Sequence, residues 1–502
     1  MEKAASIKKN FLYNISYQMV SALIPIILTP YIARVLTANG VGISSYVTAN
    51  VTYFQLFSFL GIAGHGQREI AIVRNDKQKV SRIFWELQLF HFLCGAIVLV
   101  VYLAFVAMVP SKDVRIYYIL NIIMVVASIL DISWLYQGFE CFRNIAIKNV
   151  IAKGSMVLFC LLFVKTENDL WKYILINALG LLASSAFLWK ELYQYVFPLH
   201  RVTDIHVFRH TKPVLIFFIP TIAASVYSIL DKSVINVVTH SNLQNGYYEN
   251  AYKILTILNV AVQNLSTVMS PRMSSIYGSG DEDKMKDYLN SALEVMLFLA
   301  MPLAFGMASV AKNFVPIFLG DGWSPVIPLL YVFMPLVVVL GFSTYLDGMY
   351  LVPSGKRLQS AEIICIGAAL NLVLNFVMVT YWQALGAAVA TLITEGVIAT
   401  LMLHLSKDVI DRKRILYAFL RYAIYGIIVF AGSTFAGKCI DNNYVIVLQI
   451  FAGCLIYVLL LIMTKDPILA AGFQKVNSFS KGNRLCQIYF QHFGNSSSLW
   501  TF

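Results

Sequence analysis

The sequence predicts an all-α polytopic membrane protein with about 14 transmembrane helices, and three observations carry this prediction. Hydrophobic residues make up 59% of the 502 residues, charged residues make up only 13%, and the mean hydropathy is +0.71. Apolar windows of about 20 residues, the length at which a helix crosses a bilayer, recur along most of the chain. A membrane β-barrel would instead show alternating stretches of about 10 residues. We therefore expect each spanning segment to satisfy its backbone hydrogen bonds as a helix.

The apolar windows give the expected spans in chain order. They lie at residues 11–34, 41–63, 86–109, 116–138, 145–164, 171–196, 213–238, 247–270, 287–311, 323–345, 360–380, 383–404, 415–435 and 444–464. Four longer hydrophilic segments interrupt them, at residues 64–82, 195–212, 270–287 and 406–414. The remaining connections are short turns, so no extracytoplasmic loop reaches the size of a folded domain.

The distribution of positive charge predicts the orientation. If the N-terminus is cytoplasmic, the outer segments hold only seven of the 38 Lys and Arg, and two more, Lys232 and Lys253, lie inside spans. The others fall on the cytoplasmic side, which is the asymmetry that the positive-inside rule describes. We therefore expect both termini in the cytoplasm. The formal charge of +12 is spread over these loops, where it faces anionic lipid, and does not indicate a nucleic-acid partner.

Several kinds of chemistry are not indicated. The seven cysteines are scattered singly without CxxC spacing, so we expect neither a disulfide framework nor a metal site. No GxxxxGK[ST] run is present, so an ATP site is not expected and the energy for any transport must come from ion gradients or substrate flux. We expect no cofactor.

An internal repeat divides the chain. VGISSYVTAN (41–50) is similar to NGYYENAYKI (245–254), with Gly42 and Gly246 separated by 204 residues, and Arg68 and Arg272 have the same separation. Six spans per repeat is an even number, so the two halves are expected to be related by an axis along the membrane normal. This predicts a six-helix lobe at residues 1–200, a second at 201–405, two additional helices at 406–470 and a cytoplasmic tail at 471–502. Such an architecture suggests a transporter with its site between the lobes.

The fourth span and its exit, LDISWLYQGFECFRNIAIKNVIAKG (130–154), resemble the Wzx-type polysaccharide flippase family of the multidrug/oligosaccharidyl-lipid/polysaccharide exporter superfamily. Similar segments are TPYIARVLTANGVGISSY (29–46), GHGQREIA (64–71), LDKSVINVV (230–238) and LGAAVATLITEGV (385–397). The resemblance covers nearly all of residues 5–465. It implies a non-enzymatic transporter in the bacterial cell membrane that moves an undecaprenyl-diphosphate-linked oligosaccharide to the outer leaflet. The partners it implies are membrane lipid, a polysaccharide polymerase and glycosyltransferases.

Basic residues at membrane depth are the candidate substrate-binding residues, because ionisable groups there usually face a bundle interior or a wet cavity. Lysine and arginine suit phosphate. Arg34, Lys232 and Lys253 are therefore expected to line a cationic cavity. The structural alternative for Arg34 and Lys253 is snorkelling to the interface, and for Lys232 it is an internal ion pair. Arg68 and Arg272, at cytoplasmic helix ends, either capture the incoming diphosphate or only stabilise those ends.

Three carboxylates inside spans are candidates for ion coupling or for the cavity wall: Asp131, Asp231 and Glu395. A buried carboxyl group is expensive as an anion, which suits a proton-coupled carrier. The alternative for Asp131 and Glu395 is a protonated carboxyl group that hydrogen-bonds a neighbouring helix. Asp231 either tunes Lys232, binds a coupling cation or forms an internal ion pair.

The sequence is also compatible with two other functions. A cation-coupled drug antiporter of the same superfamily would have a smaller, acidic or aromatic pocket, whereas Lys232 and Lys253 favour an anionic headgroup. A membrane-bound polysaccharide polymerase or acyltransferase would need a nucleophile or base in a sizeable outer loop, and the outer loops are short.

Overall fold

The computed structural model describes residues 7–438 and 444–470, so the tail predicted at 471–502 lies outside the described residues. Within these two ranges the secondary structure is helical, and no residue is in a β-strand. The chain forms two compact units, residues 1–249 and 250–502. The predicted division into six-helix lobes of residues 1–200 and 201–405 stays a prediction.

Ten α-helices and the start of an eleventh are described in the first unit. The complete helices are α1 (Ile7–Phe59), α2 (Ile62–Val73), α3 (Lys77–Met108), α4 (Lys112–Leu120), α5 (Ile122–Ile129), α6 (Ser133–Gly138), α7 (Phe142–Phe163), α8 (Leu170–Lys190), α9 (Leu192–Tyr195) and α10 (Thr211–Thr239). The first eight residues of α11 (Asn242–Gly278) also belong here. In the second unit α11 continues and is followed by α12 (Glu282–Leu319), α13 (Val326–Leu346), α14 (Arg357–Leu405), α15 (Arg412–Ala436) and α16 (Val445–Met463).

These helices confirm the predicted fold class, and the long ones coincide with the predicted spans. Ten helical stretches of the described residues are long and apolar enough to cross a membrane. Helices α1 and α14 each extend over two predicted spans, and each is bent at one residue with a positive φ. These residues are Thr37 (φ 58°) and Gln383 (φ 52°). The connections predicted there are therefore sharp bends rather than loops.

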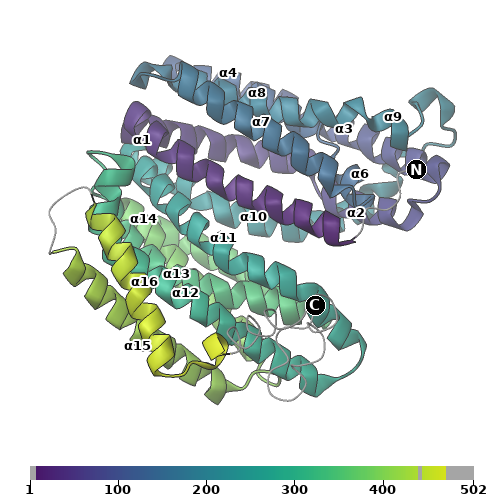
Figure 1. Cartoon of the computed structure of the whole chain (residues 1–502). Coiled ribbons are helices and arrows are strands. Elements are labelled where there is room, and N and C mark those ends of the chain that lie inside the picture. Colours follow the sequence, from purple (N-terminus) through teal and green to yellow (C-terminus); the bar gives the residue numbers. More distant parts are fainter. Residues whose placement is uncertain (1–6, 439–443, 471–502) are drawn as a thin grey trace. The chain divides into compact units, whose positions relative to one another are not determined.

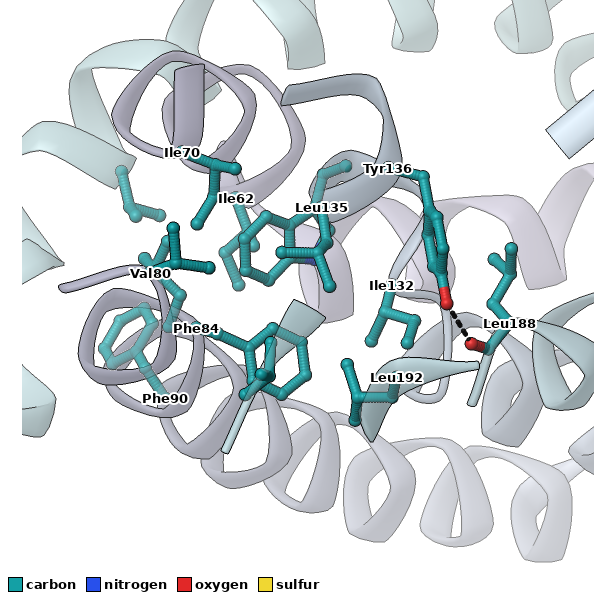
Figure 2. Close-up of a cluster of buried hydrophobic side chains, with 14 residues drawn as sticks. Ile62, Ile70, Val80, Phe84, Phe90, Ile132, Leu135, Tyr136, Leu188 and Leu192 are labelled. Carbon is teal, nitrogen blue, oxygen red and sulfur yellow. Dashed lines mark hydrogen bonds between the residues drawn. The ribbon is translucent and has the colours of Figure 1, made fainter. Parts of the chain in front are cut away.

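The hydrophilic segment predicted at 64–82 is not simply a connection, because it contains most of α2. This helix is amphipathic and buries Ile62, His65, Gly66 and Ile70. A Cβ added to Gly66 would lie 2.5 Å from the ring of Trp134 in α6, so α2 and α6 approach each other closely there. Figure 2 shows Ile62 and Ile70 in a cluster with Leu135 and Tyr136 of α6, where the Tyr136 hydroxyl donates to the Leu188 carbonyl of α8.

A buried glutamate ties the segment before α10 to α3. Glu86 of α3 is fully buried, and its carboxylate accepts from Arg82 Nε (3.1 Å), the His206 backbone N–H (3.0 Å) and His210 Nε2 (2.9 Å). The other ring nitrogen of His210 lies 2.9 Å from His65 Nε2 of α2. His210 thus bridges Glu86 and His65 through its two ring nitrogens. The network therefore joins α2, α3 and the start of α10.

We expect Glu86→Ala to destabilise the protein by about 3 kcal/mol, because it leaves the half-buried Arg82 and the buried His210 without their acceptor. Thermal unfolding of the purified protein in detergent measures this effect. Asp113→Ala, at an exposed carboxylate of the same unit, is the control and should leave the melting temperature nearly unchanged. Equal melting temperatures for both variants would contradict the structural role of Glu86.

The repeat is visible in how α3 and α12 begin. Asp76 caps α3 by accepting from the backbone N–H groups of Gln78 and Lys79, and Asp281 caps α12 by accepting from the Lys284 N–H. Each aspartate also pairs with the lysine three residues later, at 3.2 Å and 2.6 Å respectively. These hydrogen bonds and charges lower the pKa of both aspartates. Equivalent helices of the two repeats thus start with the same local structure.

In the second unit α15 packs against α12 and α16, and Figure 1 shows α15 beside α16. Arg414 at the start of α15 makes a bidentate contact with Glu294 of α12, at 3.0 Å from each nitrogen to its oxygen. It also donates to Asp287 (2.8 Å) and to Ser291 (2.7 Å). Four acceptor atoms on one face of α12 therefore hold one guanidinium group.

We expect Arg414→Met to lower the free energy of unfolding by about 2 kcal/mol, because it leaves the largely buried Glu294 carboxylate without its counter-ion. Arg414→Lys should restore only part of this loss, because an ammonium cannot reproduce the two parallel bonds. Melting temperatures in detergent check both, with the exposed Arg412→Met as the matched control. An Arg414→Met protein that melts with the wild type would show that the additional helices are held by apolar packing alone.

Candidate substrate-binding site

The candidate site begins where the second half of α1 crosses the start of α11 within the first unit. A Cβ added to Gly42 would lie 1.8 Å from the backbone oxygen of Asn242 and 2.9 Å from the nitrogen of Gly246. A Cβ added to Gly246 would lie 2.0 Å from the backbone oxygen of Ala38. Ala38 and Asn242 are separated by 204 residues, as Gly42 and Gly246 are. The crossing is therefore formed by equivalent residues of the two repeats, and only glycine allows the backbones so close.

Lys232 of α10 lies against this crossing. Its ammonium pairs with Glu249 Oε2 at 2.7 Å, and its backbone carbonyl accepts from Asn245 Nδ2 at 3.0 Å. The same Glu249 oxygen accepts from Ser45 Oγ of α1 at 2.8 Å. The Lys232 side chain is 21% exposed and that of Glu249 is 12% exposed. The ion pair is therefore partly shielded from solvent and connects α1, α10 and α11.

The neighbouring carboxylate, Asp231, is 4% exposed and accepts a hydrogen bond from the Tyr248 hydroxyl. Tyr248 is itself 1% exposed. Asp231 and Lys232 thus point to adjacent partners on α11, Tyr248 and Glu249, as residues about 100° apart on a helix can do. Both side chains therefore belong to one polar contact between α10 and α11.

A polar contact between α1 and α10 lies next to this pair. Ser233 Oγ lies 3.4 Å from Asn50 Oδ1 and 3.3 Å from the Tyr53 hydroxyl. Asn50 Nδ2 donates to the Tyr118 hydroxyl at 2.7 Å. These residues were not predicted from the sequence. The sequence signal for them is that Asn50 and Tyr53 lie three residues apart in a predicted span, which places both on one helix face.

The other candidates of the first unit lie on different segments. Arg34 is exposed on α1, one turn before the bend at Thr37, and Arg68 is exposed on α2. Asp131 lies at the break between α5 and α6, where its Oδ1 accepts from the Ser133 backbone N–H at 2.8 Å. This bond gives Asp131 a local role in starting α6.

In the second unit, Lys253 is half-buried on α11 and Glu395 is 7% exposed on α14. Arg272 is half-buried on α11, with its guanidinium carbon 5.8 Å from the centre of the Tyr288 ring. Its Nε is a buried atom without a hydrogen-bond partner among the described residues. The roles of these three residues, like those of Arg34, Arg68, Asp131, Asp231 and Lys232, stay predictions.

Comparison with solved structures identifies the fold first. The chain is similar to a structure described as lipid II flippase MurJ in an inward closed conformation, with a TM-score of 0.65 and 15% identity over 91% of this chain and 99% of the other. It is also similar to an inward-facing multidrug resistance MATE family transporter of the MOP superfamily, with a TM-score of 0.60 and 15% identity over 80% of this chain and 98% of the other. The fold is that of multi-pass membrane transporters.

Residues 7–277 match the model of the polysaccharide biosynthesis protein family, and the chain belongs to this family. A protein of Shigella dysenteriae named "Putative O-antigen transporter" is 25% identical over 407 residues, which cover 80% of this chain and all of that relative. The resemblance identified from the sequence is thus confirmed. The relative and the structural neighbours are named as transporters or flippases, in agreement with the prediction of a transporter rather than an enzyme.

Proposed function

We propose that the protein flips undecaprenyl-diphosphate-linked oligosaccharide units from the cytoplasmic to the outer leaflet for polysaccharide assembly. Alternating access through a hydrated, cationic cavity is the mechanism that we infer. The observation that carries the proposal is the Lys232 ammonium, which a polar contact of three helices holds partly buried in a protein of the polysaccharide biosynthesis family.

The physical task explains why a cation is needed there. A diphosphate that carries sugars cannot enter about 30 Å of hydrocarbon unaided, because burying its charge without partners is far too costly. A lysine ammonium offers three donors to phosphate oxygens. In this proposal Lys232, Lys253 and Arg34 bind the headgroup inside the membrane, and Arg68 and Arg272 capture it at the cytoplasmic side.

The carboxylates have a separate task in this proposal. Asp131, Asp231 and Glu395 either take up the coupling ion or shape the cavity wall, as carboxylates at membrane depth do in carriers. The protein would work in the bacterial cell membrane with both termini in the cytoplasm. Glycosyltransferases would supply its substrate and a polymerase would consume it.

A cation-coupled drug antiporter is the second candidate, and one observation favours it. Asp231 is an almost fully buried carboxylate beside Tyr248, which is the kind of acidic and aromatic environment that suits an organic cation. The ammonium of Lys232 on the next residue makes this environment less favourable for a cation, although Glu249 compensates part of its charge.

A chromosomal deletion in the source organism tests the two candidates against each other. The proposal predicts loss of surface polysaccharide, accumulation of lipid-linked oligosaccharide on the cytoplasmic side, and restoration of both by the wild-type gene. A deletion strain with normal polysaccharide and increased sensitivity to cationic drugs would support the antiporter instead.

A further inference from the structure

The carboxylate of Glu249 is the anion beside the proposed headgroup-binding lysine. Its Oε2 accepts from Lys232 at 2.7 Å and from Ser45 at 2.8 Å, with the Glu249 side chain only 12% exposed. An incoming phosphate group therefore meets an ammonium whose charge is already compensated. Any anion that binds Lys232 must either displace this carboxylate or lie next to it.

The repeat shows that the crossing of α1 and α11 does not need a carboxylate at this position. Glu249 and Ser45 are separated by 204 residues, the same offset as the glycines of the crossing, so they are equivalent residues that contact each other. The first repeat fills this position with a small neutral hydroxyl group. Packing and hydrogen bonding at the crossing are thus compatible with serine, and the negative charge belongs to the second repeat alone.

We propose that Glu249 is a specificity-determining residue that selects a diphosphate over a monophosphate linkage. The inference rests on the proposed function, since it takes Lys232 to be a headgroup ligand. A phosphodiester with one negative charge gains nothing by replacing Glu249, because one anion is exchanged for another and the carboxylate is left without its counter-ion. A diphosphate diester carries two negative charges and keeps an electrostatic advantage after the exchange.

Removing the negative charge of Glu249 should therefore reduce the preference for a diphosphate over a monophosphate linkage. We expect Glu249→Gln to bind an undecaprenyl-monophosphate-linked sugar about tenfold more tightly, because the uncompensated Lys232 ammonium accepts any anion. Affinity for the diphosphate-linked sugar should rise less, so that the preference for diphosphate falls by several fold. Glu249→Asp should retain the preference, because it keeps the charge.

The test is equilibrium binding of these two lipids to the purified full-length protein in nanodiscs. Glu167→Gln is the matched control, since Glu167 accepts from the Thr37 hydroxyl at 2.8 Å in an exposed position and should leave both affinities unchanged. Should Glu249→Gln not fold, Glu249→Ser, which introduces the residue of the first repeat, carries the same expectation.

The outcomes separate this inference from the proposed function. A wild-type protein that binds neither lipid overturns the proposed function and the inference with it. A wild-type protein that prefers diphosphate, together with Glu249 variants of unchanged or increased preference, overturns the inference alone. A reduced preference in Glu249→Gln or Glu249→Ser, with Glu249→Asp like the wild type, supports it.

Discussion

Gly42→Val is expected to abolish polysaccharide export. Even the first side-chain atom would lie 1.8 Å from the backbone oxygen of Asn242, and neither backbone can yield without moving a whole helix. Overpacking at a close contact typically costs about 1–3 kcal/mol or more, and here it would also separate α1 from the α11 residues that hold Lys232. Export is measured as surface polysaccharide in a deletion strain, normalised to the amount of variant protein in the membrane.

Two comparisons make this prediction specific. Gly246→Val, at the equivalent residue of the second repeat, should have the same effect, because its Cβ would lie 2.0 Å from the Ala38 oxygen. Gly154→Ala on α7 should be nearly silent, since a Cβ added there would have no neighbouring atom within 4 Å among the described residues. Wild-type export by Gly42→Val would show that the close crossing is not required for transport.

The second large effect is expected from Lys232→Ala and Lys253→Ala. Each should abolish or strongly reduce export per amount of folded protein in the membrane, because each removes a cation that the proposed mechanism places on the diphosphate. Loss of one charge-assisted contact weakens binding by about 1.5–3 kcal/mol, or roughly 10- to 100-fold. Complementation of the deletion strain measures this, with membrane abundance and melting temperature recorded for each variant.

A structural role for Lys232 is distinguished by a double variant. Lys232→Ala alone leaves Glu249 without its cation and would destabilise the protein for that reason, whereas Lys232→Gln with Glu249→Gln removes both charges. If the double variant is stable and inactive, the ammonium is needed for transport. If it exports polysaccharide at the wild-type level, Lys232 serves only to balance Glu249.

Much of the fold was predictable because membrane spans have a direct physical cause in the sequence. A run of about twenty apolar residues must form a helix in lipid, so the predicted spans recur as α1, α3, α7, α8 and α10–α16 with small shifts at their ends. The breaks were less visible. The span predicted at 116–138 is three helices, and one break lies at Asp131, whose side chain accepts from the backbone N–H of Ser133, the first residue of the next helix.

Helix α2 was missed for a related reason. Its sequence, IAGHGQREIAIV, has four polar or charged side chains and two glycines among its first eight residues, so hydropathy assigns it to a loop. Its buried face is one narrow stripe that contains His65 and Gly66, and what they contact is set by residues far along the chain, His210 and Trp134. Local sequence does not reveal such partners.

The charged residues of the candidate site could be predicted from the sequence, but the ion pair that they form could not. Lys232 and Asp231 stand out in an apolar helix, whereas Glu249 looks like part of a polar turn. That Glu249 is the ion partner of Lys232 follows only from the packing of α10 against α11. The offset of 204 residues was a usable signal, because it makes Ser45 the equivalent of Glu249 and so points to a symmetric contact.

The most direct test of the account is flipping by the purified protein in proteoliposomes. Undecaprenyl-diphosphate-linked oligosaccharide with a labelled sugar is placed in both leaflets, and its exposure to an added sugar-modifying enzyme is followed with time. We expect complete modification with the wild-type protein and about half with protein-free vesicles or with Lys232→Ala. Modification that stops at half with the folded wild-type protein, under every ion gradient applied, would contradict it.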